Sequence, residues 1–141
     1  MSKTKTMLAT LALGATIAFA GPAFAEKMKA TLDGKSEVPA NTSAGKGTAD
    51  INYDAATKKL TWKLTYSGLS GPATAAHFHG PAEAGKNAGV AVAIPNAVSS
   101  PVEGSATLTD AQAADLAAGK YYINVHTAAN PGGEIRGQVT K

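Results

Sequence analysis

Two neighbouring stretches of the chain alternate between apolar and polar residues with a period of two. Ala49, Ile51 and Tyr53 are the apolar residues of the first stretch, and positions 60, 62, 64 and 66 are those of the second. Successive side chains of a strand point to opposite faces of a sheet, so this period predicts two half-buried strands. Residues 54–58 between them are typical of a turn. The pair is therefore expected to be a β-hairpin.

Short strand-like segments separated by Gly and Pro turns continue on both sides of this hairpin. They span residues 28–32, 74–79, 90–94, 104–108, 121–126 and 134–140. The alternation is weak in residues 28–32, which predicts an edge strand there. Thr109 and Gln112 have the spacing of a helix capping box, and Gly119 supplies a stop, so one short helix is expected over residues 111–118. Seven or eight short strands with one short helix predict an all-β, antiparallel Greek-key sandwich or flattened barrel.

The first 25 residues have the organisation of a secretory signal peptide. Lys3 and Lys5 precede an apolar run over residues 7–19, and the sequence then reads Ala-Phe-Ala up to residue 25, which matches the small-x-small pattern that signal peptidase cleaves. The apolar run is too short to span a membrane. Cleavage predicts one β-domain over residues 26–141, located in the periplasm or secreted, with no membrane attachment.

The composition of this domain excludes several classes of site. Removal of residues 1–25 leaves 11 of the 13 basic residues and all 10 acidic residues. A nearly neutral domain gives no electrostatic reason to expect nucleic acid or anionic membranes as partners. The chain has no cysteine, which excludes a disulfide scaffold and any thiolate metal site. Met28 is the only methionine of the domain, so a methionine-rich copper(I) site is excluded as well.

All three histidines of the chain fall in predicted strands. His77 and His79 share one face of their strand, and His126 shares a face with Tyr122 and Asn124. The opposite faces are apolar, so the three imidazoles are expected to converge outside the core. Imidazole is the commonest metal ligand in proteins, and the Irving–Williams order makes copper the first choice and zinc the second. Histidines that form only hydrogen bonds are the alternative.

Four polar residues beside the predicted site are candidates for supporting it. Glu134 and Arg136 share one face of the last strand, where they would form a cross-strand ion pair, orient the metal ligands or guide an anion. Asn124 and Tyr122 would either donate hydrogen bonds to the ligands or be solvated. The sequence contains neither a nucleophile elbow nor a phosphate-binding glycine motif. These observations favour a binding protein over an enzyme.

Several blocks in this order resemble the CHRD domain, which is named after chordin and also occurs alone in exported bacterial proteins. The blocks are AHFHGPA at residues 76–82, TLT at 107–109 with LAAG at 116–119, YINVHT at 122–127 and PGGEIRGQV at 131–139. The resemblance extends over about residues 28–139. It implies that the chain could serve as an interaction or structural module in which the histidines bind no metal.

A more distant resemblance is to the copper half of copper–zinc superoxide dismutase, an eight-stranded Greek-key barrel. This resemblance implies that His77, His79 and His126 are copper ligands and that Arg136 guides the anion to copper. The chain has no further histidine for a zinc site or for a fourth copper nitrogen. The sequence therefore predicts an exported copper-binding protein for copper handling or storage, with a copper-only dismutase as an alternative. A homodimer that completes the three-histidine site is a further expectation.

Overall fold

The computed structural model describes Gly14 and residues 25–141 of the chain. The signal-peptide prediction therefore falls almost wholly outside the described residues. The elements, in chain order, are β1 (Glu26–Asp33), β2 (Lys46–Asp54), β3 (Lys59–Ser67), β4 (Ala73–His79), β5 (Val90–Ala93), β6 (Val102–Thr107), α1 (Asp110–Ala117), β7 (Tyr122–Thr127) and β8 (Ile135–Gln138). Eight strands and one short helix confirm the predicted all-β fold.

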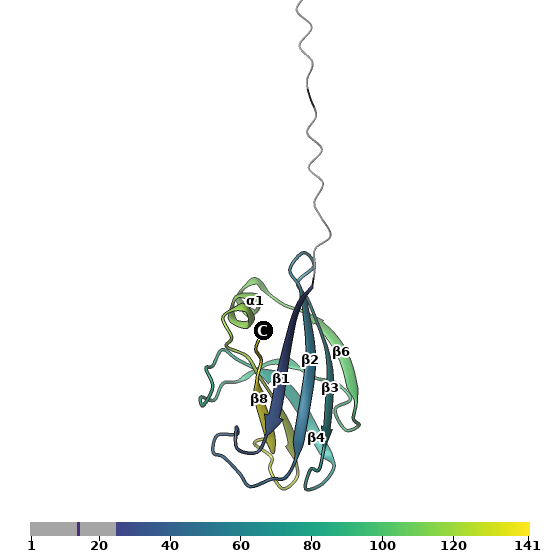
Figure 1. Cartoon of the computed structure of the whole chain (residues 1–141), viewed down its shortest axis with the longest axis vertical. Coiled ribbons are helices and arrows are strands. Elements are labelled where there is room, and N and C mark those ends of the chain that lie inside the picture. Colours follow the sequence, from purple (N-terminus) through teal and green to yellow (C-terminus); the bar gives the residue numbers. More distant parts are fainter. Residues whose placement is uncertain (1–13, 15–24) are drawn as a thin grey trace, which may run out of the picture.

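All eight strands belong to one antiparallel sheet with the order β5-β4-β7-β8-β1-β2-β3-β6. The sheet curls into a nearly closed barrel, with β1, β2, β3 and β6 on one side and β4 and β8 on the other (Figure 1). Hairpins join β1 to β2, β2 to β3, β4 to β5 and β7 to β8. The chain crosses between the two sides after β3, after β5 and, through α1, after β6, which matches the predicted Greek-key class.

The edge-strand prediction for residues 28–32 is wrong. These residues lie in β1, which pairs with β2 from Glu26 to Asp33 and meets β8 and the C-terminal residues on its other side. The strands at the two ends of the sheet order are β5 and β6. Periodicity reports which face of a strand is buried, and it carries no information on how many neighbours the strand has.

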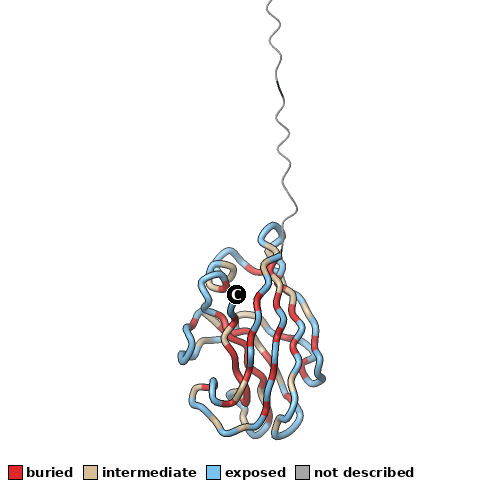
Figure 2. Tube along the Cα trace, viewed as in Figure 1, coloured by how far each residue is buried: buried red, intermediate tan, exposed pale blue. Residues whose placement is uncertain are grey.

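The inner faces of the strands form one apolar core. The expected hairpin is present, with Ile51 opposite Trp62 in the β2–β3 register. Trp62 joins the two sides of the barrel, because its ring lies edge-on to the ring of Phe78 with centroids 5.2 Å apart. Buried and exposed residues alternate along β1, β2 and β3 in Figure 2, whereas β7 is largely buried on both faces. The period of two seen in the sequence is thus the period of burial.

The predicted capping box of the helix is formed. Thr109 accepts a hydrogen bond from the backbone of Gln112, and the Gln112 side chain accepts one from the Thr109 backbone. The Gln112 amide also donates to the backbone oxygen of Ala91 in β5, which ties α1 to this edge of the sheet. Leu116 anchors the helix in the core. Among the described residues, no helix has the length and apolar character needed to cross a membrane.

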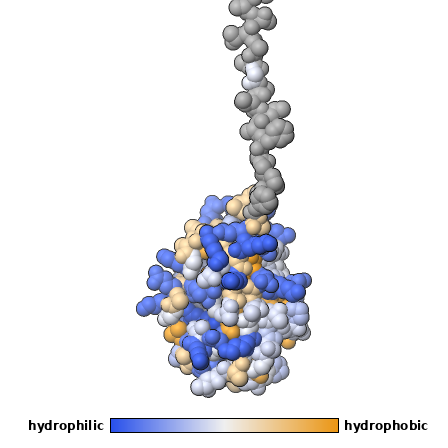
Figure 3. Space-filling model, in the orientation of Figure 1, coloured by the Kyte–Doolittle hydropathy of each residue, from blue (hydrophilic) through white to orange (hydrophobic). Residues whose placement is uncertain are grey.

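The surface of the described domain is largely polar in the view of Figure 3. Among the described residues, Val90 and Val98 are the large apolar side chains that stand exposed. On the outer face of β4 and β7, three loops come together: residues 34–45 after β1, residues 80–89 after β4 and residues 128–134 after β7. The predicted histidine site lies beneath these loops.

Candidate metal centre

The three histidines lie on the same outer face of two neighbouring strands. In the β4–β7 register, His77 is opposite Asn124, His79 is opposite Tyr122, and His126 is opposite Ala75. His126 is therefore the diagonal neighbour of His77, a position from which long side chains can meet. One ring nitrogen from each histidine lies within 4.8 Å of the other two. The fold thus brings together the three imidazoles that the sequence placed on compatible faces.

His126 is oriented by the loop that follows its strand. Its Nδ1 lies 2.8 Å from the backbone oxygen of Pro131. Because a carbonyl oxygen only accepts, Nδ1 carries the proton and Nε2 keeps its lone pair. That Nε2 lies 3.1 Å from Nδ1 of His77. A carbonyl that fixes the tautomer of an imidazole is the usual support of a metal-binding histidine.

His79 is held by a second loop and by a stacked ring. Its Nδ1 lies 3.0 Å from the backbone oxygen of Ala88. The Tyr122 ring stacks on the imidazole with centroids 4.9 Å apart and planes within 4° of parallel. The Tyr122 hydroxyl donates to the Ala88 oxygen and accepts from the Ala88 nitrogen. With 8% of its surface exposed, His79 is the most buried of the three histidines.

Arg136 contacts the site through Tyr122 and not through an imidazole. Its guanidinium carbon lies 3.5 Å from the centre of the Tyr122 ring, on which it makes a cation–π contact. One terminal nitrogen donates to Asn87 Oδ1 over 2.8 Å, and the other donates to the backbone oxygen of Lys86. Only 2% of Arg136 is exposed. Arg136, Tyr122 and His79 thus form a layered stack that holds the loop of residues 80–89 on the barrel.

Neither Glu134 nor Arg136 forms an ion pair among the described residues, so the expectation of a cross-strand ion pair is wrong. The Glu134 carboxylate instead accepts hydrogen bonds from the side chains of Ser43, Ser70, Thr127 and Asn130 and from the Ser70 backbone nitrogen. Burial raises the pKa of the Glu134 carboxyl, but these hydrogen bonds outweigh burial and hold the pKa at about 2. Glu134 therefore fastens loops at this end of the barrel, and its hydrogen-bond partners include no histidine.

Asn124 does contact a histidine. Its Oδ1 lies 2.9 Å from Nε2 of His79, and its Nδ2 donates to the backbone oxygen of Gly132. Both groups are buried, since 3% of Asn124 and 8% of His79 are exposed. Of the four supporting candidates, Asn124 and Tyr122 thus touch His79 directly, Arg136 lies one ring further out, and Glu134 holds the surrounding loops.

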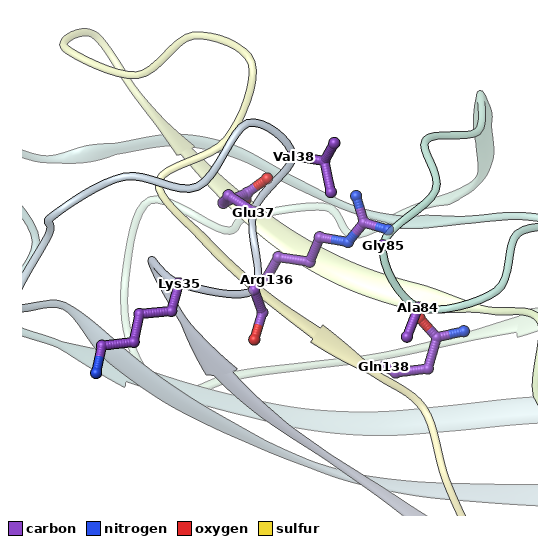
Figure 4. Close-up of a pocket in the computed structure, with 8 residues that line it drawn as sticks. Lys35, Glu37, Val38, Ala84, Gly85, Arg136 and Gln138 are labelled. Atoms are coloured by element: carbon purple, nitrogen blue, oxygen red, sulfur yellow. The ribbon is translucent and has the colours of Figure 1, made fainter.

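Glu37 is a buried acid beside the site that the sequence did not single out. It lies in the loop after β1 with 6% of its surface exposed, and its Oε1 has no hydrogen-bond partner among the described residues. Figure 4 shows Glu37 and Arg136 lining one hollow of about 250 Å³, with Ala84 and Gly85 on the wall formed by the loop after β4. Burial raises the pKa of Glu37 to about 7, although the charge of Arg136 opposes the shift. A lone glutamate in a predicted loop gives no signal of such burial.

The surroundings of His77 and His79 favour uncharged rings. Burial is the main cause that lowers the pKa of His77, and the neighbouring imidazoles lower it further. Burial also lowers the pKa of His79 and outweighs its hydrogen bonds to Ala88 and Asn124. Only an uncharged imidazole offers a lone pair to a metal. Three imidazoles lie close together, two of them (His79 and His126) oriented by backbone carbonyls and two of them (His77 and His79) in surroundings that favour the neutral ring. This arrangement fits a borderline-soft divalent ion such as copper or zinc.

Comparison with known proteins gives one match. The family model of the CHRD domain matches residues 28–139. No curated protein and no solved structure matches the chain. The match covers β1 from Met28 onward and all of the other strands, and it includes the three histidines, so the candidate metal centre lies within this domain.

Proposed function

The chain belongs to the CHRD domain family, and we propose that it uses this barrel to bind a copper ion through His77, His79 and His126. Zinc is the second choice of metal. The observation that carries the proposal is the approach of three ring nitrogens to within 4.8 Å of one another. Nitrogen sites have their highest affinity for Cu²⁺ among the first-row divalent metals, which places copper ahead of zinc.

The proposed setting is outside the cytoplasm. The signal-peptide pattern of residues 1–25 supports export to the periplasm or beyond. In that setting a domain with one metal site and no nucleophile motif suits copper handling or storage better than catalysis. We propose this role for the protein.

Arg136 gives no support to dismutase chemistry. An anion guide needs a guanidinium that faces the approaching anion, whereas both terminal nitrogens of Arg136 are taken by the loop of residues 80–89. Its guanidinium contacts the Tyr122 ring, and that ring in turn stacks on His79, so Arg136 reaches the imidazole only through Tyr122. We therefore propose metal binding without dismutation.

The proposal is tested by isothermal titration calorimetry of the purified protein with Cu²⁺ and Zn²⁺. The wild type is expected to bind one equivalent, with copper tighter than zinc. The His77→Ala/His79→Ala/His126→Ala variant is expected to lose this binding. Met28→Leu is the matched control, because it removes the only sulfur of the domain at a buried position and should leave binding unchanged. Equal copper binding by the wild type and the triple variant would refute the proposal and leave the interaction-module alternative.

A further inference from the structure

The two ring nitrogens of His79 both face hydrogen-bond acceptors. Nδ1 lies 3.0 Å from the Ala88 oxygen, and Nε2 lies 2.9 Å from Oδ1 of Asn124. A neutral imidazole carries one N–H and can donate to only one of them. If Nδ1 of His79 carries the proton and donates it to the Ala88 oxygen, Nε2 has no proton. The lone pair of Nε2 then faces a lone pair of Asn124 Oδ1. A cation that accepts both lone pairs would remove this conflict.

The Asn124 amide is oriented so that its oxygen faces His79. Its Nδ2 donates to Gly132 and lies beside the unpartnered Oε1 of Glu37. The two groups border one small space, because a Cβ added to Gly133 would come within 2.6 Å of Nδ2 and 2.4 Å of Oε1. The Gly132 oxygen accepts from this amide nitrogen, and the ionised form of Glu37 attracts it, so both favour this orientation over its flipped form, in which oxygens would meet.

Two short separations within this cluster each match a pair of donors that share one metal ion. Two donors at right angles on one Cu²⁺ ion, each about 2.0–2.2 Å from it, lie roughly 3 Å apart. Nδ1 of His77 and Nε2 of His126 are 3.1 Å apart, and Nε2 of His79 and Oδ1 of Asn124 are 2.9 Å apart. A metal on Nε2 of His79 would therefore meet Oδ1 at bonding distance or have to displace it.

We propose that Oδ1 of Asn124 is the fourth ligand of the metal site and that Glu37 is the positioning residue that holds the Asn124 amide for it. This inference rests on the proposed function, since it concerns the same metal. It deepens that function by assigning a donor set of three nitrogens and one oxygen. An amide oxygen is a hard donor, so the site selects a divalent ion over Cu⁺. The carboxylate of Glu37 also offsets the charge of a divalent ion bound to four neutral ligands.

The test combines copper affinity with pulsed electron paramagnetic resonance of the Cu²⁺-loaded protein in D₂O. The wild-type spectrum is expected to lack the deuterium signal of an equatorial water, because Oδ1 occupies the fourth position. Asn124→Leu should acquire that water signal and lose ~10–100-fold in copper affinity, the range seen when a supporting group of a metal site is removed. Detection of an equatorial water in the wild-type protein would by itself overturn the inference.

A swap of the two side chains tests the role assigned to Glu37. In Glu37→Gln/Asn124→Asp, the aspartate offers an oxygen to the metal and its other oxygen accepts from the glutamine amide. The swap should restore affinity to within ~10-fold of the wild type, whereas Glu37→Gln alone should weaken binding. Failure of the swap to improve on Asn124→Leu would contradict the positioning role.

The outcomes separate this inference from the proposed function. Copper binding that requires the three histidines but is unchanged in Asn124→Leu would refute the fourth ligand and leave the proposed function intact. A copper-dependent doubling of the solution mass that persists in Asn124→Leu would assign the fourth donor to a second copy of the chain, as in the homodimer expected from the sequence. Absence of copper and zinc binding by the wild type would refute both.

Discussion

Glu134 carries an unusual number of hydrogen bonds for one carboxylate. It accepts from the side chains of Ser43 and Thr127 among others, and none of its surface is exposed. Its donors lie in the loop after β1, in the loop after β3, and at the end of β7 with the loop that follows it, so the carboxylate links segments that are far apart in the sequence. A buried acid that is satisfied in this way stabilises the fold only while it is ionised.

The stability of the protein should therefore fall in acid through Glu134. Its pKa is about 2 in the folded state and about 4.3 in the unfolded chain. A depressed folded-state pKa contributes stability that is complete above the unfolded value and is lost as the pH falls from about 4.3 to 2. Urea denaturation at intervals between pH 6 and pH 2 measures this loss.

Glu134→Gln should remove most of this acid-dependent loss of stability. It should also lower the free energy of unfolding at pH 7 by about 1.5–3 kcal/mol, the usual value for a hydrogen bond to a charged group. Asp50→Asn, which changes an exposed carboxylate on β2, is the control and should leave the pH profile as it is. A Glu134→Gln profile that matches the wild type would contradict the structural role given to this acid.

The metal-ligand candidates could be predicted from the sequence because each rests on a period of two within one strand. His77 and His79 need only the alternation of β4 to share a face, and the same rule places Asn124 beside His126 on β7. The carbonyls of Ala88 and Pro131 could not be predicted, because every residue has a backbone oxygen. Glu37 was missed for a related reason, since its burial depends on how the loop after β1 packs against residues distant in sequence.

At the scale of elements, the contact between β3 and β6 depends on the absence of a side chain. Gly104 of β6 lies opposite Trp62 of β3, and a Cβ at position 104 would come within 2.6 Å of the indole ring. The ring of Trp62 also contacts Phe78 across the core and has little freedom to move. Gly104 therefore lets the largest side chain of the core lie against the edge strand.

Gly104→Ala should destabilise the barrel by about 1–3 kcal/mol, the usual cost of an overpacked contact. The expected readouts are a lower thermal midpoint and a change in Trp62 fluorescence. Gly89→Ala is the control, because no atom lies within 4 Å of a Cβ at that position. Equal midpoints for the two variants would show that the indole can shift at no cost.

The strands and the helix could be predicted from the sequence more readily than the order of the strands in the sheet. Alternation predicted the β2–β3 hairpin, and the capping box of Thr109 and Gln112 predicted the helix. The interior position of β1 was not predictable, because its second neighbour, β8, comes from the other end of the chain. Short-range patterns determine whether a segment is a strand, whereas long-range packing determines which strands lie at the edges.

At the scale of the whole molecule, metal binding and folding should be coupled. The site joins β4 to β7 and is closed by two loops, so a metal that binds there binds the folded state alone. Copper at 100 times its Kd should add about 2.7 kcal/mol to the free energy of unfolding. For a domain of this size that corresponds to roughly 10 °C in the melting temperature.

Thermal denaturation by circular dichroism, with and without copper, measures this coupling. The increase should be reversed by a chelator and should be absent in the His77→Ala/His79→Ala/His126→Ala variant. Met28→Leu should show the same copper-dependent increase as the wild type, since this substitution leaves the site unchanged. A copper-dependent increase that persists in the triple variant would place the metal elsewhere on the protein.

The central claim is that imidazole rings from two strands hold one metal ion on the outside of the barrel. X-ray absorption spectroscopy of the protein loaded with one equivalent of Cu²⁺ counts those rings directly, because imidazole gives a characteristic multiple-scattering pattern. Three imidazole ligands per copper is the predicted result. A copper ion with one imidazole or none would contradict the account.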